Sequence, residues 1–126
     1  MTRVTGIGGI FFKARDPQTL GAWYRDHLGL DVTDWDGAIF NWGGPESEPG
    51  MTIWSVVKND TTQMDPGTAS FMVNFRVADL QALLAALRSE GCNVMDRTEE
   101  SEQGKFGWVI DPEGNKVELW EPPIGV

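Results

Sequence analysis

The stretch Phe106-Gly-Trp-Val-Ile-Asp-Pro-Glu-Gly-Asn-Lys-Val-Glu-Leu-Trp120 combines turn residues at its centre with strand-forming residues on both sides. Pro112 fixes its own φ, and Gly114 and Asn115 tolerate a positive φ, so the centre predicts a tight turn. Apolar and β-branched runs on either side of a turn are typical of strands. The stretch therefore predicts a β-hairpin.

Alternation along the second strand of this hairpin separates its side chains into two faces. Val117 and Leu119 are apolar and would face a core, which leaves Lys116, Glu118 and Trp120 on the opposite face. A one-residue slip would exchange the two faces, so the turn decides which side chains are buried. A carboxylate among aromatic residues on a sheet face is either a salt-bridge partner or part of a binding site, and the hairpin alone leaves both open.

Hydrophobic periodicity divides the rest of the chain into strands and two helices. Asp16 and Pro17 favour a helix start, and Gly29 ends that helix. Asp79 would cap a second helix over residues 80–90. The expected strands are 6–14, 30–35, 38–42, 51–57, 71–77, 93–97, 106–110 and 116–120, with a hairpin turn at 36–37 and loops at 43–50, 58–67 and 98–103.

The two halves of the chain repeat each other. Sliding the sequence by about 63 residues pairs Phe12 with Phe75 and Asp16 with Asp79. Each half has the order βαβββ, and neither half alone would easily bury its sheet face and its helix. The 126 residues are therefore predicted to form a single domain of two tandem modules, 1–64 and 67–126.

The run Asp-Pro-Glu-Gly-Asn-x-Val-Glu-Leu at 111–119 resembles the C-terminal signature of the vicinal oxygen chelate superfamily, which holds glyoxalases, bleomycin-resistance proteins and extradiol dioxygenases. Residues 23–30 and 75–80 extend the resemblance over nearly the whole chain. The resemblance implies an α+β fold in which two βαβββ modules form a curved mixed sheet with a concave cleft. It also implies that Glu118 stands where the last metal ligand of the family lies, and that the protein is a homodimer. Exposed strand edges favour the same assembly.

The other metal positions of the family carry residues that do not suit a divalent metal. The family pattern of a His seven residues before an Asp places Gly9 and Met72 at the two His positions, and the remaining position falls near Trp54 or Ser55. Glycine has no side chain, and a thioether suits Cu(I) better than harder ions. One carboxylate does not hold zinc. The sequence therefore predicts a protein without a metal or another cofactor, and a metal-dependent enzyme with non-standard ligands stays as an alternative.

Charge and cysteine content narrow the possible partners and the compartment. The formal net charge is −9 and the chain lacks a Lys/Arg cluster, which argues against nucleic acid and anionic membrane surfaces. An acidic chain favours cationic or neutral ligands, although solubility alone also explains the charge. Cys92 is the single cysteine, so a reducing, cytoplasmic location is expected. Met-Thr-Arg-Val-Thr-Gly at the start does not resemble a signal peptide.

Aromatic residues are frequent, with six Trp in 126 residues. Most aromatic residues belong to cores, but a sheet covered by helices on one face must enclose something with the other. Arg76 would be an ion-pair partner of Glu118 or would hold an anionic substituent of a ligand. The predicted ligand-binding residues are Phe11, Trp54, Met72, Asn74, Arg76, Trp108 and Trp120, with Glu118 as the polar anchor or catalytic residue.

The residues and the family resemblance together leave two function classes. The first is a metal-free protein that binds a small aromatic or amphipathic molecule, as the resemblance to bleomycin-resistance proteins implies. The second is a lyase or isomerase in which Glu118 is a general base. A partner-binding subunit with a closed pocket is a weaker third possibility. His27 at the end of the first helix and the acidic residues 99–102 are better explained as helix-end and solvated surface residues.

Overall fold

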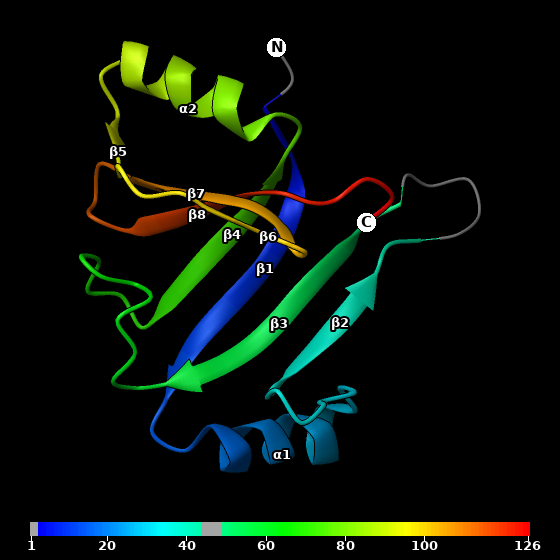
Figure 1. Cartoon of the computed structure of the whole chain (residues 1–126). Helices are drawn as coiled ribbons and strands as arrows, with labels where there is room; N and C mark the ends of the chain where they lie inside the picture. The colour runs from blue at the N-terminus through cyan, green and yellow to red at the C-terminus, as the bar shows by residue number, and fades with distance from the viewer. Residues whose placement is uncertain (1–2, 44–48) are drawn as a thin grey trace.

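The computed structural model describes residues 3–43 and 49–126, and this part of the chain forms one mixed sheet with two helices (Figure 1). The fold predicted from the sequence, an open curved sheet with helices, is confirmed. The strands are β1 (Val4–Ala14), β2 (Gly37–Asn41), β3 (Met51–Lys58), β4 (Phe71–Val77), β5 (Asn93–Val94), β6 (Glu99–Ser101), β7 (Gly104–Ile110) and β8 (Lys116–Glu121), and the helices are α1 (Pro17–Leu28) and α2 (Leu80–Ser89).

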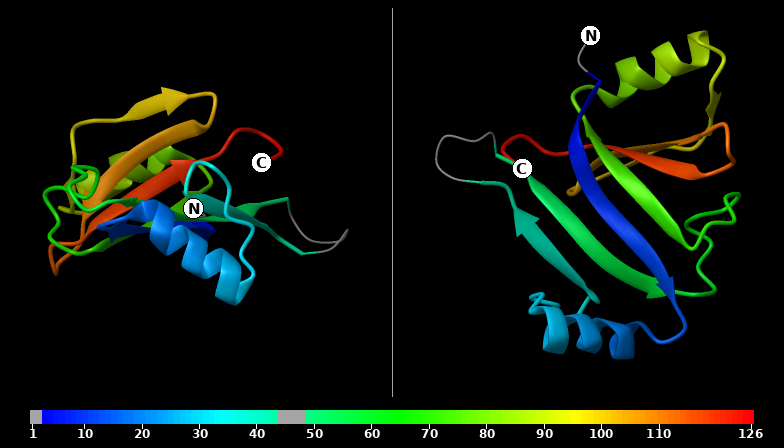
Figure 2. Two further views of the ribbon diagram at one scale, coloured as in Figure 1. Left: turned by 90° about the horizontal axis from the view of Figure 1, so that it is seen from below. Right: turned by 180° about the vertical axis from the view of Figure 1, so that it is seen from behind.

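The sheet joins two groups of strands along its centre. Its order is β2-β3-β1-β4-β8-β7-β5, with β6 paired to β7. Strands β1 and β4 are antiparallel neighbours, β1 pairs with β3 in parallel, and β4 pairs with β8 in parallel. The two groups therefore have matching connections around the β1–β4 pair. Curvature turns β7 and β8 across the direction of β1 and β3 (Figures 1 and 2).

The main hydrophobic core lies between helix α2 and the strands beneath it. Leu80, Leu83 and Leu84 of α2 are buried against Leu119 of β8, and Val117 packs at the edge of this cluster. Helical spacing puts the three leucines on one face, and Asp79 caps the helix by accepting a hydrogen bond from the Ala82 amide. Burial of Leu119 against α2 directs Glu118 to the other face of the sheet, as predicted.

Helix α1 lies at the opposite end of the sheet from α2 (Figure 2). Asp16 caps its start, Pro17 is its first residue, and Gly29 ends it with φ of 72°. Tyr24 of α1 packs on Trp54 of β3, with ring centroids 4.6 Å apart. Within the described residues, neither helix combines the length and the apolar character needed to cross a membrane.

Three predicted elements differ in the structure. Residues 30–35 are not a strand, because their backbone groups bond locally: the Val32 amide donates to Leu30 and the Thr33 amide to Gly37. The expected strand at 93–97 is shortened to β5. The expected loop at 98–103 contains β6, because Glu99 and Ser101 pair with β7. The predicted loop at 43–50 lies largely outside the described residues.

Candidate functional site

A cavity of about 690 Å³ opens on the face of the sheet turned away from α2. Strands of both halves of the chain contribute to it, and most of its lining is apolar. The residues that matter below are Phe11, Ile53, Asn74, Phe106, Glu118 and Trp120. Depressions of similar volume beside the start of α1 are lined by exposed charged residues such as Arg15 and Asp60. The cavity is therefore the site with a predominantly apolar interior and a partly buried carboxylate.

Glu118 is held in the cavity wall by two neutral hydrogen-bond donors. In the sheet it lies opposite Asn74 of β4 on one side and Trp108 of β7 on the other. Asn74 Nδ2 donates to Glu118 Oε1 over 2.6 Å, and Trp108 Nε1 donates to Oε2 over 2.9 Å. The strand register therefore fixes both oxygens of the carboxylate.

The environment of Glu118 favours its protonated form. Burial raises the pKa of the Glu118 carboxyl above its ordinary value, and the hydrogen bonds from Asn74 and Trp108 and the charge of Lys116 oppose this effect less strongly. No salt bridge to Glu118 occurs among the described residues. A carboxylate bound by neutral donors and short of water is suited to receive a cationic or hydrogen-bond-donating group, or a proton.

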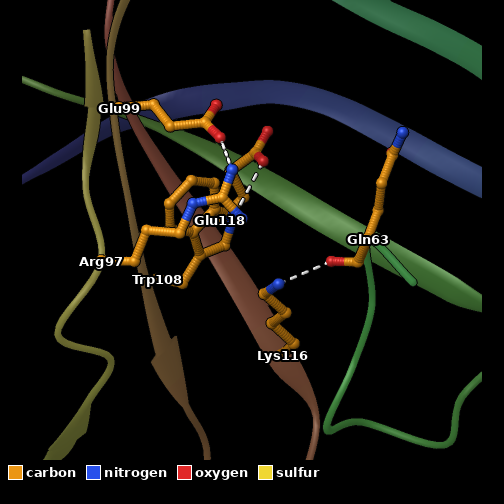
Figure 3. A network of polar contacts seen from close by, with 6 residues as sticks. All are labelled: Gln63, Arg97, Glu99, Trp108, Lys116 and Glu118. Atoms are coloured by element: carbon orange, nitrogen blue, oxygen red, sulfur yellow. Dashed lines mark hydrogen bonds and ion pairs between the residues drawn. The ribbon is translucent and has the colours of Figure 1, made fainter.

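A second, more polar groove of about 480 Å³ reaches Glu118 from the side of β6 and β7. Figure 3 shows its side chains, with Arg97 and Lys116 both beside the indole of Trp108. The Arg97 guanidinium carbon lies 5.6 Å and Lys116 Nζ 5.2 Å from the ring centroid. Lys116 also donates to the Gln63 main-chain oxygen, and Arg97 pairs with Glu99. Glu118 therefore belongs to the walls of both the apolar cavity and the polar groove.

Asn74 fits its position because Gly8 has no side chain. The pairing of β1 with β4 is irregular between Ile7 and Gly9, which marks a β-bulge at Gly8. A Cβ on Gly8 would overlap Asn74 Oδ1 and would lie 3.0 Å from Trp120 Cε3. Gly8 was not among the site residues predicted from the sequence. Two consecutive glycines within a predicted strand were the available signal, because glycine in a strand often marks a bulge.

Arg76 does not pair with Glu118, so the predicted ion pair is wrong. Arg76 lies opposite Trp120, two residues along β4 from Asn74. Its Nη2 donates to the main-chain oxygen of Val126 over 2.6 Å. Its guanidinium carbon lies 4.8 Å from the ring centroid of Trp42 and 5.4 Å from that of Trp120. The register of the strands directs Arg76 toward residues 122–126 rather than toward Glu118.

The four family metal positions meet on the concave face but do not supply a metal site. Ser55 and Glu118 lie opposite Phe11 and Asn74, which are equivalent residues of the two halves, so Ser55, and not Trp54, is the counterpart of Glu118. The set is then Gly9, Ser55, Met72 and Glu118. Even a Cβ on Gly9 would come within 2.8 Å of the Ile53 main-chain oxygen. Within the described residues, no three His, Cys, Asp or Glu are arranged to hold a metal ion. These donors do not fit the divalent metals of the family.

The structure brings four of the eight predicted site residues into the cavity wall, namely Phe11, Asn74, Glu118 and Trp120. Met72 and Trp108 lie just behind it, where both are buried with Met64. Trp108 also lines the polar groove, and Arg76 contacts the wall through Trp120 and Val126. The prediction that Trp54 lines the cleft was wrong.

Trp54 lies on the opposite face of the sheet, against Phe12 and Tyr24. Its neighbours Ile53 and Ser55 line the cavity instead. Apolar residues occupy both odd and even positions of this strand, so the sequence alone does not decide which set faces the cavity. Only the parallel pairing with β1 decides the phase.

Comparison with known proteins agrees with this fold. The model of the glyoxalase-like domain family matches residues 9–120, and the chain belongs to this family. A comparison with curated proteins finds no match.

Solved structures with the same fold have low sequence identity to the chain. Methylmalonyl-CoA epimerase from Mycobacterium tuberculosis is 20% identical, with a TM-score of 0.62, over 98% of this chain and 91% of the other. A variant of methylmalonyl-CoA epimerase from Streptomyces coelicolor, in complex with 2-nitronate-propionyl-CoA, is 19% identical, with a TM-score of 0.69, over 94% and 98%. A glyoxalase/bleomycin resistance protein/dioxygenase superfamily member from Vibrio splendidus 12B01 is 12% identical, with a TM-score of 0.58, over 91% and 97%. At these identities the likeness concerns the fold.

Proposed function

We propose that this protein binds a small aromatic or amphipathic molecule in the cavity, with a cationic or hydrogen-bond-donating group of the ligand against Glu118. The observation that carries the proposal is the position of this carboxylate in a largely apolar wall, where two neutral donors hold it. Sites of this kind orient a mostly apolar ligand through a few polar contacts. The formal net charge of −9 supports a ligand that is cationic or neutral.

The ring systems beside Glu118 supply the apolar part of this site. Phe106 and Trp120 are stacked, with an interplanar angle of 13° and ring centroids 6.3 Å apart. Trp120 Nε1 donates to the Gln103 main-chain oxygen over 2.8 Å, which fixes the indole. Phe11 lies in the wall from the side of β1. A fixed aromatic surface next to the partly buried carboxylate of Glu118 suits a flat ligand that carries an amine.

A matched pair of ligands tests the role of Glu118. We expect naphthylmethylamine to bind more tightly than methylnaphthalene, which has a similar ring system without the amine. Glu118→Gln should weaken binding of the amine about tenfold or more, because a charge-assisted hydrogen bond is lost, and should change binding of the neutral compound little. Glu113→Gln, in an exposed turn, is the control with the same loss of charge. Isothermal titration that detects neither ligand at millimolar concentration would contradict the proposal.

A second candidate function is an isomerase in which Glu118 moves a proton at a carbon atom. The raised pKa of Glu118 favours it, because a general base is most effective with a pKa near the working pH. The epimerases with a similar fold support the same chemistry. However, the described cavity lining contains no cationic side chain, and Arg76, which lies behind the wall, donates to Val126 and does not pair with Glu118, where an enolate would form. Binding is therefore the better supported function.

Hydrogen exchange distinguishes the two candidates. An isomerase would exchange the α-proton of a short acyl thioester in deuterated water, and NMR would follow the loss of that proton. Glu118→Gln should abolish the exchange, whereas Glu113→Gln should keep it. Absence of exchange with bound thioester would leave the binding function and exclude proton transfer on this substrate class.

A further inference from the structure

Arg76 is a buried cation whose hydrogen-bonding capacity is largely unused. Its exposed fraction is 7%, and Nε and Nη1 are buried without a hydrogen-bond partner among the described residues. The ion pairs between described residues do not include it. A buried guanidinium is normally paired, because an uncompensated charge in a poorly solvated position is costly. Arg76 therefore has the features of a side chain that awaits an anionic partner.

Two aromatic rings and one oxygen of Val126 surround the Arg76 guanidinium. The rings of Trp42 and Trp120 are placed for cation–π contacts, and Val126 accepts a single hydrogen bond from Nη2. A planar guanidinium between aromatic surfaces keeps its N–H groups in one plane, which is the arrangement that binds a carboxylate or sulfonate through two parallel hydrogen bonds. Each bidentate edge of the guanidinium combines Nη2 with either Nε or Nη1, and both Nε and Nη1 are unused.

Arg76 lies behind the wall of the cavity described above and contacts two of its residues. Trp120 and Val126, two of its three partners, are residues of the cavity wall. Arg76 lies opposite Trp120 in the same strand pair in which Asn74 lies opposite Glu118. Two residues along a strand correspond to about 7 Å, so Glu118 and Arg76 are within the span of one small ligand.

We propose that Arg76 is the anion-binding residue of this cavity, and that it holds the carboxylate or sulfonate of an amphipathic aromatic acid. The main-chain oxygen of Val126 accepts from Nη2 of Arg76 in the structure, and the ligand anion would take over this hydrogen bond while a second oxygen accepts from either Nε or Nη1. The inference rests on the proposed function and narrows its ligand class to aromatic molecules with an acidic group at one end, for Arg76, and an amine or another hydrogen-bond donor for Glu118.

Two fluorescent dyes separate the anion from the aromatic part of the ligand. Anilinonaphthalenesulfonate carries a sulfonate, and N-phenylnaphthylamine has the same rings without it. Arg76→Met should weaken binding of the sulfonate about tenfold to a hundredfold, the size of a lost charge-assisted pair, and should change binding of the neutral dye less than about threefold. Arg76→Lys should lose part of the affinity for the sulfonate, because an ammonium lacks the planar fork.

Arg15→Met is the matched control. Arg15 is exposed and directly follows the C-terminal end of β1. Arg76 pairs with Gly6, near the other end of the same strand. The variant has the same change of net charge as Arg76→Met and should leave the affinities for both dyes unchanged. A loss of sulfonate affinity in Arg15→Met as large as in Arg76→Met would reveal a general charge effect and overturn the assignment.

The outcomes for the two proposals differ. If neither dye binds the wild-type protein, the proposed function fails. If the neutral dye binds but Arg76→Met affects both dyes equally or neither, only the assignment of Arg76 fails. Should Arg76→Met not fold, NMR of isotope-labelled wild-type protein replaces it: the Arg76 Nε–H signal should move with benzenesulfonate and stay with benzenesulfonamide. An unmoved signal with benzenesulfonate would overturn the assignment.

Discussion

Glu118 illustrates how a buried carboxylate is stabilised here without a cationic partner. Asn74 and Trp108 each donate one hydrogen bond to it, and the described salt bridges do not involve it. Its charge is therefore tolerated through neutral contacts, which offset only part of the cost of burial. Replacement of this residue separates a role in binding from a role in stability.

We expect the free energy of unfolding of Glu118→Gln to lie within about 1 kcal/mol of the wild-type value, or to exceed it. The amide can accept from Trp108 and donate to Asn74 Oδ1 if the Asn74 amide reverses, and Oδ1 has no partner among the described residues. Urea denaturation measures the difference, with Glu113→Gln as the control. A loss of about 3–5 kcal/mol would instead indicate a broken buried ion pair.

The same variant should change how stability depends on pH. The folded protein holds the Glu118 proton to a higher pH than the unfolded chain does, because burial raises the pKa of the carboxyl. The folded state then binds more protons, so this contribution to stability is complete below the unfolded pKa and is lost as the pH rises through the folded pKa. The advantage of Glu118→Gln over the wild type should grow as the pH rises above about 4, the ordinary pKa of a glutamate, and level off above the raised pKa of the folded state. A constant difference, or one that grows toward low pH, would contradict the raised pKa.

The residues at the family metal positions lead to an expectation about composition. We expect the isolated protein to carry no stoichiometric transition metal, because Gly9, Ser55 and Met72 give no suitable donors beside Glu118. Elemental analysis of protein dialysed without chelator checks this. About one metal per chain that disappears in Glu118→Gln would show that the site binds metal through other groups.

At the scale of elements, the bulge in β1 and the turn before β8 place the site residues. Asp111 Oδ1 accepts hydrogen bonds from the amides of Glu113 and Asn115, each over 2.9 Å, and Gly114 adopts φ of 84°. The turn fixes the register of β8 and therefore the face that Glu118 occupies. The bulge at Gly8 leaves the space in which Asn74 reaches Glu118.

Gly8→Ala should weaken ligand binding, because the new Cβ overlaps Asn74 Oδ1 and displaces the donor that orients Glu118. We expect the affinity for naphthylmethylamine to fall severalfold, about the effect of one lost hydrogen bond. Gly114→Ala is the comparison. It should lower the unfolding free energy by about 1–2 kcal/mol through its positive φ and keep the affinity of the folded protein. Unchanged affinity in Gly8→Ala would show that Asn74 does not position Glu118.

At the scale of the molecule, the exposed apolar residues near β2 favour a second copy as partner. Ile39 and Phe40 of this edge strand are 48% and 49% exposed, and Trp35 before it is 45% exposed. An edge strand with exposed apolar side chains is a place where chains pair. We therefore expect a homodimer. The reducing compartment inferred from Cys92 also stays a prediction.

Light scattering at micromolar concentration should give twice the chain mass of 13.9 kDa. Phe40→Lys should shift the protein toward the monomer, because a charge at the edge opposes pairing. Val4→Lys, at a similarly exposed position of β1, is the control. A monomeric wild type would contradict the expected assembly.

The sequence by itself determined the elements whose signals are local. Helix α1 has its cap residues at both ends, and α2 has its cap at the start and four leucines at helical spacing. The turn at 111–115 has residues that suit its backbone, and alternation after it assigns Val117 to the core and Glu118 to the other face. The repeat of the two halves predicted the modular sheet. Such features depend on residues that are neighbours in the chain, so they can be predicted from the sequence alone.

Only the tertiary structure decided which side chains meet across the sheet. Pairing of β3 with β1 placed Ser55 in the cavity and Trp54 against α1, although both are neighbours in the sequence. Pairing of β4 with β8 placed Glu118 opposite Asn74. The same pairing placed Arg76 opposite Trp120, where it donates to Val126. The physical reason is that strand register is set by long-range packing. A shift of one residue exchanges the faces of a strand, and where both faces carry apolar residues the sequence pattern does not choose between them.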